Sequence, residues 1–95
     1  MITRIVKMTF KPEDLEEFKK KFYESQNLIK AFDGCVHLEL LNDLQDEYTF
    51  FTISHWNSEE DLELYRNSYL FKNIWSKVKP LFAKKAEAWS LTSKK

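Results

Sequence analysis

The segment from Glu47 to Val78 constrains the fold more than any other part of the chain, because it places a strand directly before two short helices. Residues 48–54 (YTFFTIS) are β-branched and aromatic, a composition typical of strands. Residues 57–61 (NSEED) follow as a helix-start signal, in which Asn57 with Glu60, or Ser58 with Asp61, has the spacing of a capping box. The segment therefore predicts a strand and then a helix that begins near residue 58.

A second helix follows within the same segment. Ser68 can cap it, and the apolar side chains after it recur at helical spacing, at Phe71, Ile74, Trp75 and Val78. Pro80 ends this helix, because its ring removes a backbone donor and clashes with the preceding turn.

The rest of the chain supplies partners for these elements. Residues 2–10, 35–41 and 86–92 alternate between the two sides of a strand, and Pro12 opens a helix whose apolar stripe is Leu15, Phe18, Phe22 and Ile29. On residues 35–41 the alternation sets Val36, Leu38 and Leu40 against Cys35, His37, Glu39 and Leu41. The order is βαββαβ, which predicts one domain over residues 1–95 with an α+β, ferredoxin-like fold, a four-stranded antiparallel sheet with helices on one face.

Charge and cysteine content exclude several classes of function. Fifteen Lys and Arg balance fifteen Asp and Glu, so no global positive field exists to attract nucleic acid or an anionic membrane. A single cysteine cannot form an intrachain disulfide, and charged residues interrupt the N-terminal segment before a signal-peptide core could form. We therefore expect a cytoplasmic protein with no membrane span and no nucleic-acid partner.

The predicted sheet is apolar on both faces, although helices can cover only one. The third strand carries Tyr48, Phe50 and Trp56 on one side and Phe51 and Ile53 on the other, and the last strand adds Trp89 and Leu91. A monomer would expose a larger apolar patch than soluble monomers usually show. This pattern predicts a two-fold homodimer in which two sheets pack face to face.

Several segments together resemble the antibiotic-biosynthesis monooxygenase family. They are residues 32–35 (FDGC), 50–56 (FFTISHW), 65–68 (YRNS) with Phe71 and Trp75, and 88–90 (AWS), and the likeness extends over nearly the whole chain. The resemblance implies a dimeric α/β barrel in which each subunit has a cavity between its sheet and its helices. Some members of the family oxygenate phenols or hydroquinones without metal, flavin or haem. Others degrade haem, and relatives include isomerases.

Cofactor-independent oxygenation requires an apolar slot for the rings, a base at the hydroxyl and donors that hold the resulting anion. We therefore interpret His55 as a candidate base, Tyr65 and Asn67 as hydrogen-bonding groups, and Arg66 as an anion-binding group. The candidate lining of the slot is Trp56, Phe71 and Trp75. We expect no cofactor and a small aromatic or hydroquinone-type substrate.

Each of these residues also has a structural interpretation. His55 could bond to a neighbouring backbone group, the tryptophans could be core residues, and Arg66 could pair with an acid on its own helix or with a partner subunit. Cys35, His37 and Glu39 share one strand face near His55, but their spacing matches no standard metal site, so no metal is expected. The alternatives to an oxygenase are a dimeric module that binds a hydrophobic metabolite without turnover, and an isomerase that uses the same cavity.

The haem-degrading branch of the family makes a specific demand that the sequence does not meet. Haem degradation there relies on an asparagine, a tryptophan and an iron-ligating histidine, and the corresponding positions in this chain are Val6, Tyr65 and Trp75. Because none of the three is retained, the resemblance argues against haem degradation.

Overall fold

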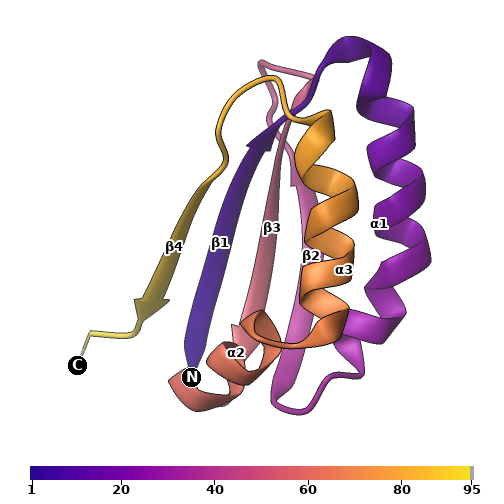
Figure 1. Cartoon of the computed structure of the whole chain (residues 1–95). Coiled ribbons are helices and arrows are strands. Elements are labelled where there is room, and N and C mark those ends of the chain that lie inside the picture. Colours follow the sequence, from indigo (N-terminus) through magenta and orange to yellow (C-terminus); the bar gives the residue numbers. More distant parts are fainter. Residues whose placement is uncertain (95) are drawn as a thin grey trace.

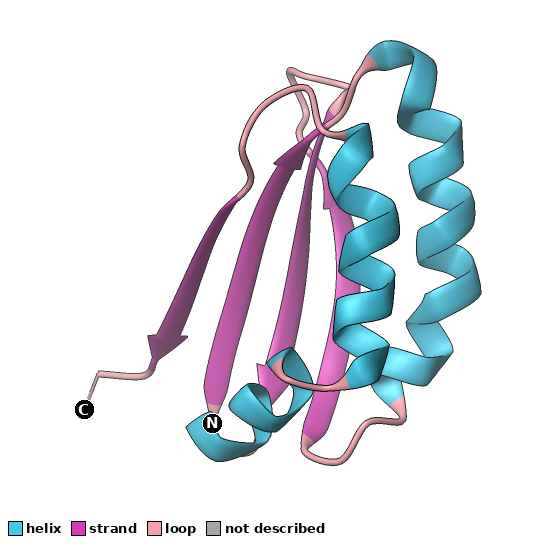
Figure 2. Cartoon of the chain, viewed as in Figure 1, coloured by secondary structure: helices cyan, strands magenta, loops and turns pink. Residues whose placement is uncertain are grey.

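The computed structural model, which describes residues 1–94, shows a four-stranded antiparallel sheet with three helices on one face (Figures 1 and 2). The elements are β1 (Ile2–Thr9), α1 (Leu15–Lys30), β2 (Cys35–Asn42), β3 (Thr49–Trp56), α2 (Glu59–Arg66), α3 (Tyr69–Val78) and β4 (Glu87–Thr92). The strand order is β2-β3-β1-β4, with every neighbouring pair antiparallel. This arrangement confirms the predicted α+β, ferredoxin-like fold. No helix within residues 1–94 combines the length and apolar character that crossing a membrane requires.

Local signals in the sequence set the helix boundaries. Ser58 Oγ accepts a hydrogen bond from the Asp61 amide at 3.1 Å, so of the two predicted capping boxes the one at Ser58 begins α2. Ser68 Oγ accepts in the same way from the Phe71 amide at 3.1 Å and begins α3. That helix ends at Val78, and Pro80 lies in the 3-10 turn that follows. Both predicted starts and the predicted stop are confirmed.

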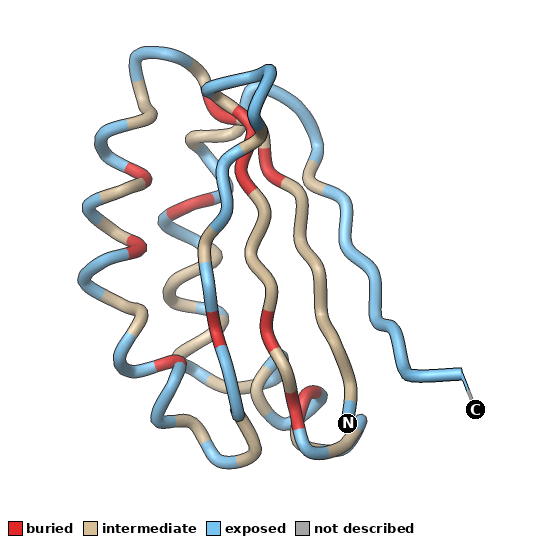
Figure 3. The backbone as a smooth tube through the Cα atoms, turned by 180° about the vertical axis from the view of Figure 1, so that it is seen from behind, coloured by how far each residue is buried: buried red, intermediate tan, exposed pale blue. Residues whose placement is uncertain are grey.

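Strand register divides the side chains of the sheet between two environments. The cross-strand pairs Met8 with Phe50, Val6 with Thr52, and Arg4 with Ser54 lie on the side that the helices cover. The opposite side, which we call the open face, carries Thr3, Ile5, Lys7, His37, Glu39, Leu41, Phe51, Ile53, His55, Trp89 and Leu91. Seen from behind, no helix lies over this face, and the edge strand β4 is exposed along its length (Figure 3).

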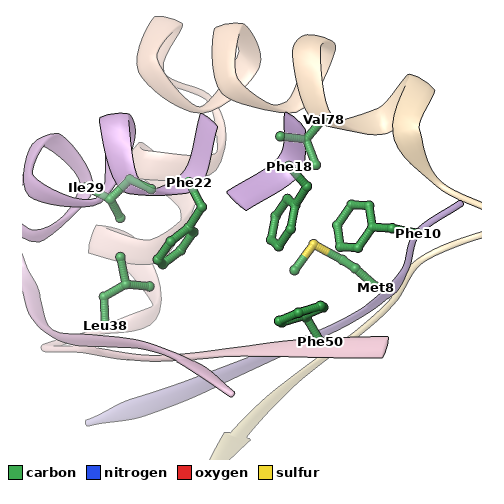
Figure 4. Close-up of a cluster of buried hydrophobic side chains, with 8 residues drawn as sticks. All are labelled: Met8, Phe10, Phe18, Phe22, Ile29, Leu38, Phe50 and Val78. Atoms are coloured by element: carbon green, nitrogen blue, oxygen red, sulfur yellow. The ribbon is translucent and has the colours of Figure 1, made fainter. Parts of the chain in front are cut away.

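The core lies between the sheet and the helix pair α1 and α3. Phe18 is 2% exposed, and its ring stacks on Phe10 with centroids 3.9 Å apart (Figure 4). Phe22 and Ile29 follow on the same stripe of α1, as predicted, and Val78 of α3 joins them. The close packing of these rings fixes the distance between helices and sheet at this end of the molecule.

Two predicted face assignments on β2 are wrong. Cys35 was placed with His37 and Glu39, but it pairs with Trp56 and so lies on the helix-covered side. The alternation placed Val36 with Leu38 and Leu40, but Val36 is 52% exposed, whereas Leu38 is buried. The pairing of β2 with β3 shifts between Cys35 and His37, so one extra residue is accommodated there as a bulge. The bulge turns Val36 away from the core, and the alternation resumes after it.

Gly34 joins α1 to β2 in a conformation that other residues rarely adopt. Its φ is +88°, and its carbonyl accepts a hydrogen bond from the Asn57 amide at 2.9 Å. A Cβ atom at this position would also overlap the side chain of Asp61 at the start of α2. The turn therefore requires glycine for two independent reasons.

We expect Gly34→Ala to lower the free energy of unfolding by about 2–3 kcal/mol, because the substitution adds backbone strain and a steric overlap. Urea denaturation followed by circular dichroism measures the change. Asp33→Ala, in the same turn but exposed and without positive φ, is the matched control and should stay within about 0.5 kcal/mol of wild type. Equal effects of the two substitutions would contradict this account of the turn.

Candidate functional site

A cavity of about 320 Å³ lies between the helix-covered face of the sheet and the helices. All four strands and all three helices contribute to its lining, so it is formed by the fold as a whole and not by one loop. Its volume is at the lower end of the range for small-molecule sites, which suits a ligand of one or two rings. The cavity that the family resemblance implied is therefore present between the sheet and the helices.

Aromatic side chains form one wall of this cavity. Trp56 of β3 is fully buried, and its ring stacks on Tyr65 of α2 with centroids 4.8 Å apart. Tyr65 meets the edge of Phe71 at 5.2 Å, and Phe71 stacks on Trp75 at 5.9 Å. Trp56, Phe71 and Trp75 all belong to the lining, so the structure brings together the three residues predicted to form the slot. We call this group with Tyr65 the aromatic wall.

The polar residues that line the cavity include two arginines, a tyrosine, two serines, a threonine and Glu87. Arg4 of β1, and Tyr65 and Arg66 of α2, all line it. Arg4 Nη1 donates to Ser90 Oγ at 2.9 Å, and Arg66 Nη1 lies 2.8 Å from Glu63 Oε1. The Arg66 side chain is 41% exposed, so it stands where the cavity meets solvent.

Burial changes the chemistry of two of these groups. Burial raises the pKa of Tyr65 well above its ordinary value, with a smaller contribution from nearby Cys35. Its hydroxyl therefore stays protonated near neutral pH and can donate a hydrogen bond, but it cannot serve as a base there. Burial, and secondly the positive charge of Arg66, lower the pKa of Arg4, although Glu63 opposes the change.

The structure does not bring His55 to the cavity. His55 pairs with Thr3 and His37 in the sheet register and therefore lies on the open face, one residue out of phase with buried Trp56. Its Nδ1 lies 3.0 Å from Thr3 Oγ1, and its ring centroid lies 5.5 Å from that of His37. The interpretation of His55 as the base of this cavity is inconsistent with this placement, because strand alternation directs it to the opposite side of the sheet.

Asn67 also lies outside the lining. Its Nδ2 donates to the Glu63 carbonyl at 2.9 Å, and its backbone amide donates to the same oxygen at 3.0 Å. Both bonds satisfy a carbonyl at the end of α2, so Asn67 has a structural role at the helix terminus. The structure therefore places neither His55, the predicted base, nor Asn67, the predicted hydrogen-bonding group, in the lining of the cavity.

Arg4 is a cationic lining residue that the sequence analysis did not identify. It occupies the same phase of the first strand as Ile2, Val6 and Met8, which the alternation assigned to the core side. A cation within an otherwise apolar strand face is the signal that could have identified it, since charged residues are rarely placed there without a function.

Of the four polar residues weighed as a metal site, His37, Glu39 and His55 lie on the open face, whereas Cys35 pairs with Trp56 and so lies on the helix-covered side. His37 Nε2 lies 3.5 Å from Glu39 Oε1, and Cys35 Sγ points to the His37 carbonyl at 3.7 Å. Over residues 1–94 no group of three or more His, Cys, Asp or Glu side chains has an arrangement suited to a metal ion.

Comparison with known proteins places the chain in a family. The model of the family described as "Antibiotic biosynthesis monooxygenase" matches residues 1–76. Among solved structures, one described as an antibiotic biosynthesis monooxygenase has a TM-score of 0.92 at 16% identity, with 100% of each chain covered. A conserved protein of Methanosarcina mazei Go1 has a TM-score of 0.92 at 22% identity, covering 99% of this chain and 94% of that one.

The protein Rv0793 of Mycobacterium tuberculosis has a TM-score of 0.90 at 16% identity, covering 99% of this chain and 95% of that one. No curated protein matched the chain. Identities this low show a shared fold, whereas the family match covers most of the sequence. The chain belongs to the antibiotic biosynthesis monooxygenase family.

Proposed function

We propose that the protein is a cofactor-independent monooxygenase that acts on a small aromatic or hydroquinone-type substrate in the cavity. The observation that carries the proposal is one cavity that is lined both by the aromatic wall, whose Tyr65 carries a protonated hydroxyl, and by the guanidinium groups of Arg4 and Arg66. An aromatic ring can lie against the wall while its ionised oxygen is held by Arg4, Arg66 and Tyr65. Family membership agrees with this chemistry without specifying a substrate.

The reaction proposed for a phenol needs only dioxygen as co-substrate. The phenol ionises as the cationic end of the cavity stabilises its anion, and the proton passes to water near half-exposed Arg66. The ring carbon para to the anion transfers electrons to dioxygen and forms a carbon–oxygen bond. That oxygen becomes a carbonyl, and the other oxygen atom leaves as water with the phenolic and ring hydrogens. The phenol is oxidised to a quinone and dioxygen is reduced.

We expect Tyr65→Phe to lower kcat/KM for oxygen uptake by about tenfold to a hundredfold, because a hydrogen bond to a charged oxygen contributes about 1.5–3 kcal/mol. An oxygen electrode with a panel of hydroquinones and anthrones measures the rate. His55→Ala is the matched control and should leave the rate unchanged, since this side chain lies on the open face. Loss of uptake in His55→Ala alone, with Tyr65→Phe active, would contradict the assignment of the site.

A second candidate function is binding without turnover. The observation that favours it is the composition of the lining. Among the described residues that line the cavity there is no histidine, and the one carboxylate residue is Glu87. Glu87 pairs with Lys7 in the sheet register, which places its side chain toward the open face. An isomerase needs an acid and a base in the cavity, so it has less support than a binding module. Ligand binding with no oxygen uptake from any substrate would favour the binding module.

We further propose that two copies of the chain pack through their open faces. Ile5, Phe51, Ile53 and Trp89 form an apolar strip across three strands of this face. In the single chain Trp89 is 42% exposed and Leu91 is 49% exposed. These two large apolar side chains are neighbours on the same face of β4, and such exposed apolar patches often mark an interface. A face-to-face homodimer would cover this strip while leaving the cavity of each subunit on the other side of its sheet.

A further inference from the structure

Arg4 stands in the cavity without a carboxylate partner. Within residues 1–94 its side chain takes part in no ion pair, and its recorded side-chain hydrogen bond is the one to Ser90 Oγ. A guanidinium has five N–H donors in a planar fork, so most of the donors of Arg4 remain available to a ligand. Along β1 the neighbours of Arg4 on this face, Ile2 and Val6, are apolar, and its cross-strand partners Ser54 and Ser90 are neutral. The positive charge of Arg4 therefore stands in a largely apolar part of the cavity.

Arg66 brings a second positive charge to the same cavity. It is paired with Glu63 on its own helix, yet it still acts electrostatically on Arg4, whose pKa it lowers after the larger effect of burial. Two guanidinium groups with one carboxylate leave a net positive charge at this end of the site. Like charges held close together destabilise each other, and a ligand anion between them would relieve that repulsion.

The planar fork of a guanidinium matches a carboxylate better than it matches a single phenolate oxygen, because a carboxylate can accept two parallel N–H bonds. The aromatic wall, in turn, offers ring faces to a flat apolar group. A ligand that satisfies both parts carries a ring system and a permanent anionic group at one end.

We propose that the cavity selects aromatic carboxylates, with the ring against Trp56, Phe71 and Trp75 and the carboxylate held between Arg4 and Arg66. This inference rests on the proposed function for the location of the site, and it narrows the substrate class to hydroxylated aromatic acids. It is tested by binding, so its outcome does not depend on whether the protein consumes oxygen.

The test compares two ligands of nearly equal size and shape by isothermal titration calorimetry. 2-Naphthoate carries the carboxylate, and 2-naphthalenemethanol replaces it with a neutral alcohol. We expect the wild-type protein to bind the carboxylate at least about tenfold more tightly, since charge-assisted hydrogen bonds contribute about 1.5–3 kcal/mol. Raising the NaCl concentration should weaken binding of the carboxylate and leave binding of the alcohol unchanged.

Variants identify the groups responsible. Arg4→Gln should remove most of the preference for the carboxylate, and Arg4→Lys should retain part of it, because lysine keeps the charge and loses the fork. Lys7→Gln is the matched control: it removes a cation from the same strand but on the open face, so the preference should persist. Thermal unfolding of each variant verifies that it is folded.

Any of three results would overturn this inference. The wild-type protein could bind the two ligands with equal affinity, or it could fail to bind 2-naphthoate at millimolar concentration. The preference for the carboxylate could also survive the combined substitutions Arg4→Gln and Arg66→Gln. A preference for the carboxylate combined with no oxygen uptake from any hydroxylated aromatic would support the inference and contradict the oxygenase proposal. Oxygen uptake without a preference for the carboxylate would support the oxygenase proposal and contradict this inference.

Discussion

Phe18→Ala is expected to lower the free energy of unfolding by about 3–5 kcal/mol, a large part of the stability of a domain this small. Phe18 is 2% exposed and contacts three other rings, stacking on Phe10 at 3.9 Å and meeting Phe50 at 5.6 Å and Phe22 at 6.2 Å. Its removal leaves a hole that the surrounding rings cannot fill without giving up their own contacts. Chemical denaturation followed by far-UV circular dichroism measures the loss.

Tyr23→Ala is the matched control for this substitution. Tyr23 is an aromatic residue on the same helix, but it is 58% exposed. The two substitutions change helix propensity by similar amounts, so a difference between them isolates the effect of core burial. We expect Tyr23→Ala to cost less than about 1 kcal/mol. A comparable loss in both variants would show that the ring cluster between α1 and the sheet does not dominate stability.

Phe18 also lines the cavity, so its core role and its site role are connected. The cluster fixes the separation of α1 from the sheet at one end, and the cavity occupies the space that remains toward Arg4 and α2. A variant that collapses the cluster should therefore also reduce ligand binding, whereas Tyr23→Ala should not. The core thus maintains the volume in which the proposed chemistry takes place.

Periodicity and capping were sufficient to predict the elements, because these signals are local. Ser58 and Ser68 begin helices where the sequence indicated, and the stripe Phe18, Phe22 and Ile29 is buried as its spacing requires. The bulge at Val36 was not predictable in this way, since one extra residue in a strand changes the pairing without altering composition. Strand ends also differed by one or two residues: the third strand was predicted over residues 48–54 and spans Thr49–Trp56.

The site was predicted less completely than the fold because membership of a cavity depends on strand phase. Trp56 and His55 are adjacent, yet one lies in the cavity and the other on the open face. Chemical suitability favoured His55, although its phase with Phe51 and Ile53 already indicated the other side. The error for Arg4 was the opposite one. Arg4 was not considered a cavity residue because it is charged, although it alternates in phase with Val6 and Met8 on the helix-covered side. Applied consistently, the alternation on β1 and β3 would have corrected both assignments.

The second large expected effect is that of a substitution on the open face on the stability of the proposed dimer. Ile53→Asp should raise the dissociation constant of the dimer by at least about a thousandfold, because the two-fold axis places two new carboxylates in the interface and each costs about 2 kcal/mol or more to desolvate. Ile53 lies at the centre of the open face, between Ile5 on β1 and Glu39 on β2. Sedimentation velocity at micromolar concentration measures the effect: the wild type should sediment at twice the 11.5 kDa of one chain, and the variant at the mass of one chain.

Leu44→Asp makes a similar apolar-to-acidic change in the fully exposed connection between β2 and β3, and it should remain dimeric. Far-UV circular dichroism separates dissociation from unfolding, since a folded monomer of Ile53→Asp retains the spectrum of the wild type. A wild-type protein that sediments as one folded chain would show that the open face has no partner of its own kind. The cavity would survive that result, because every residue that lines it comes from a single chain. The proposed dimer and the proposed ligand binding can therefore be tested independently, because they involve opposite faces of one sheet.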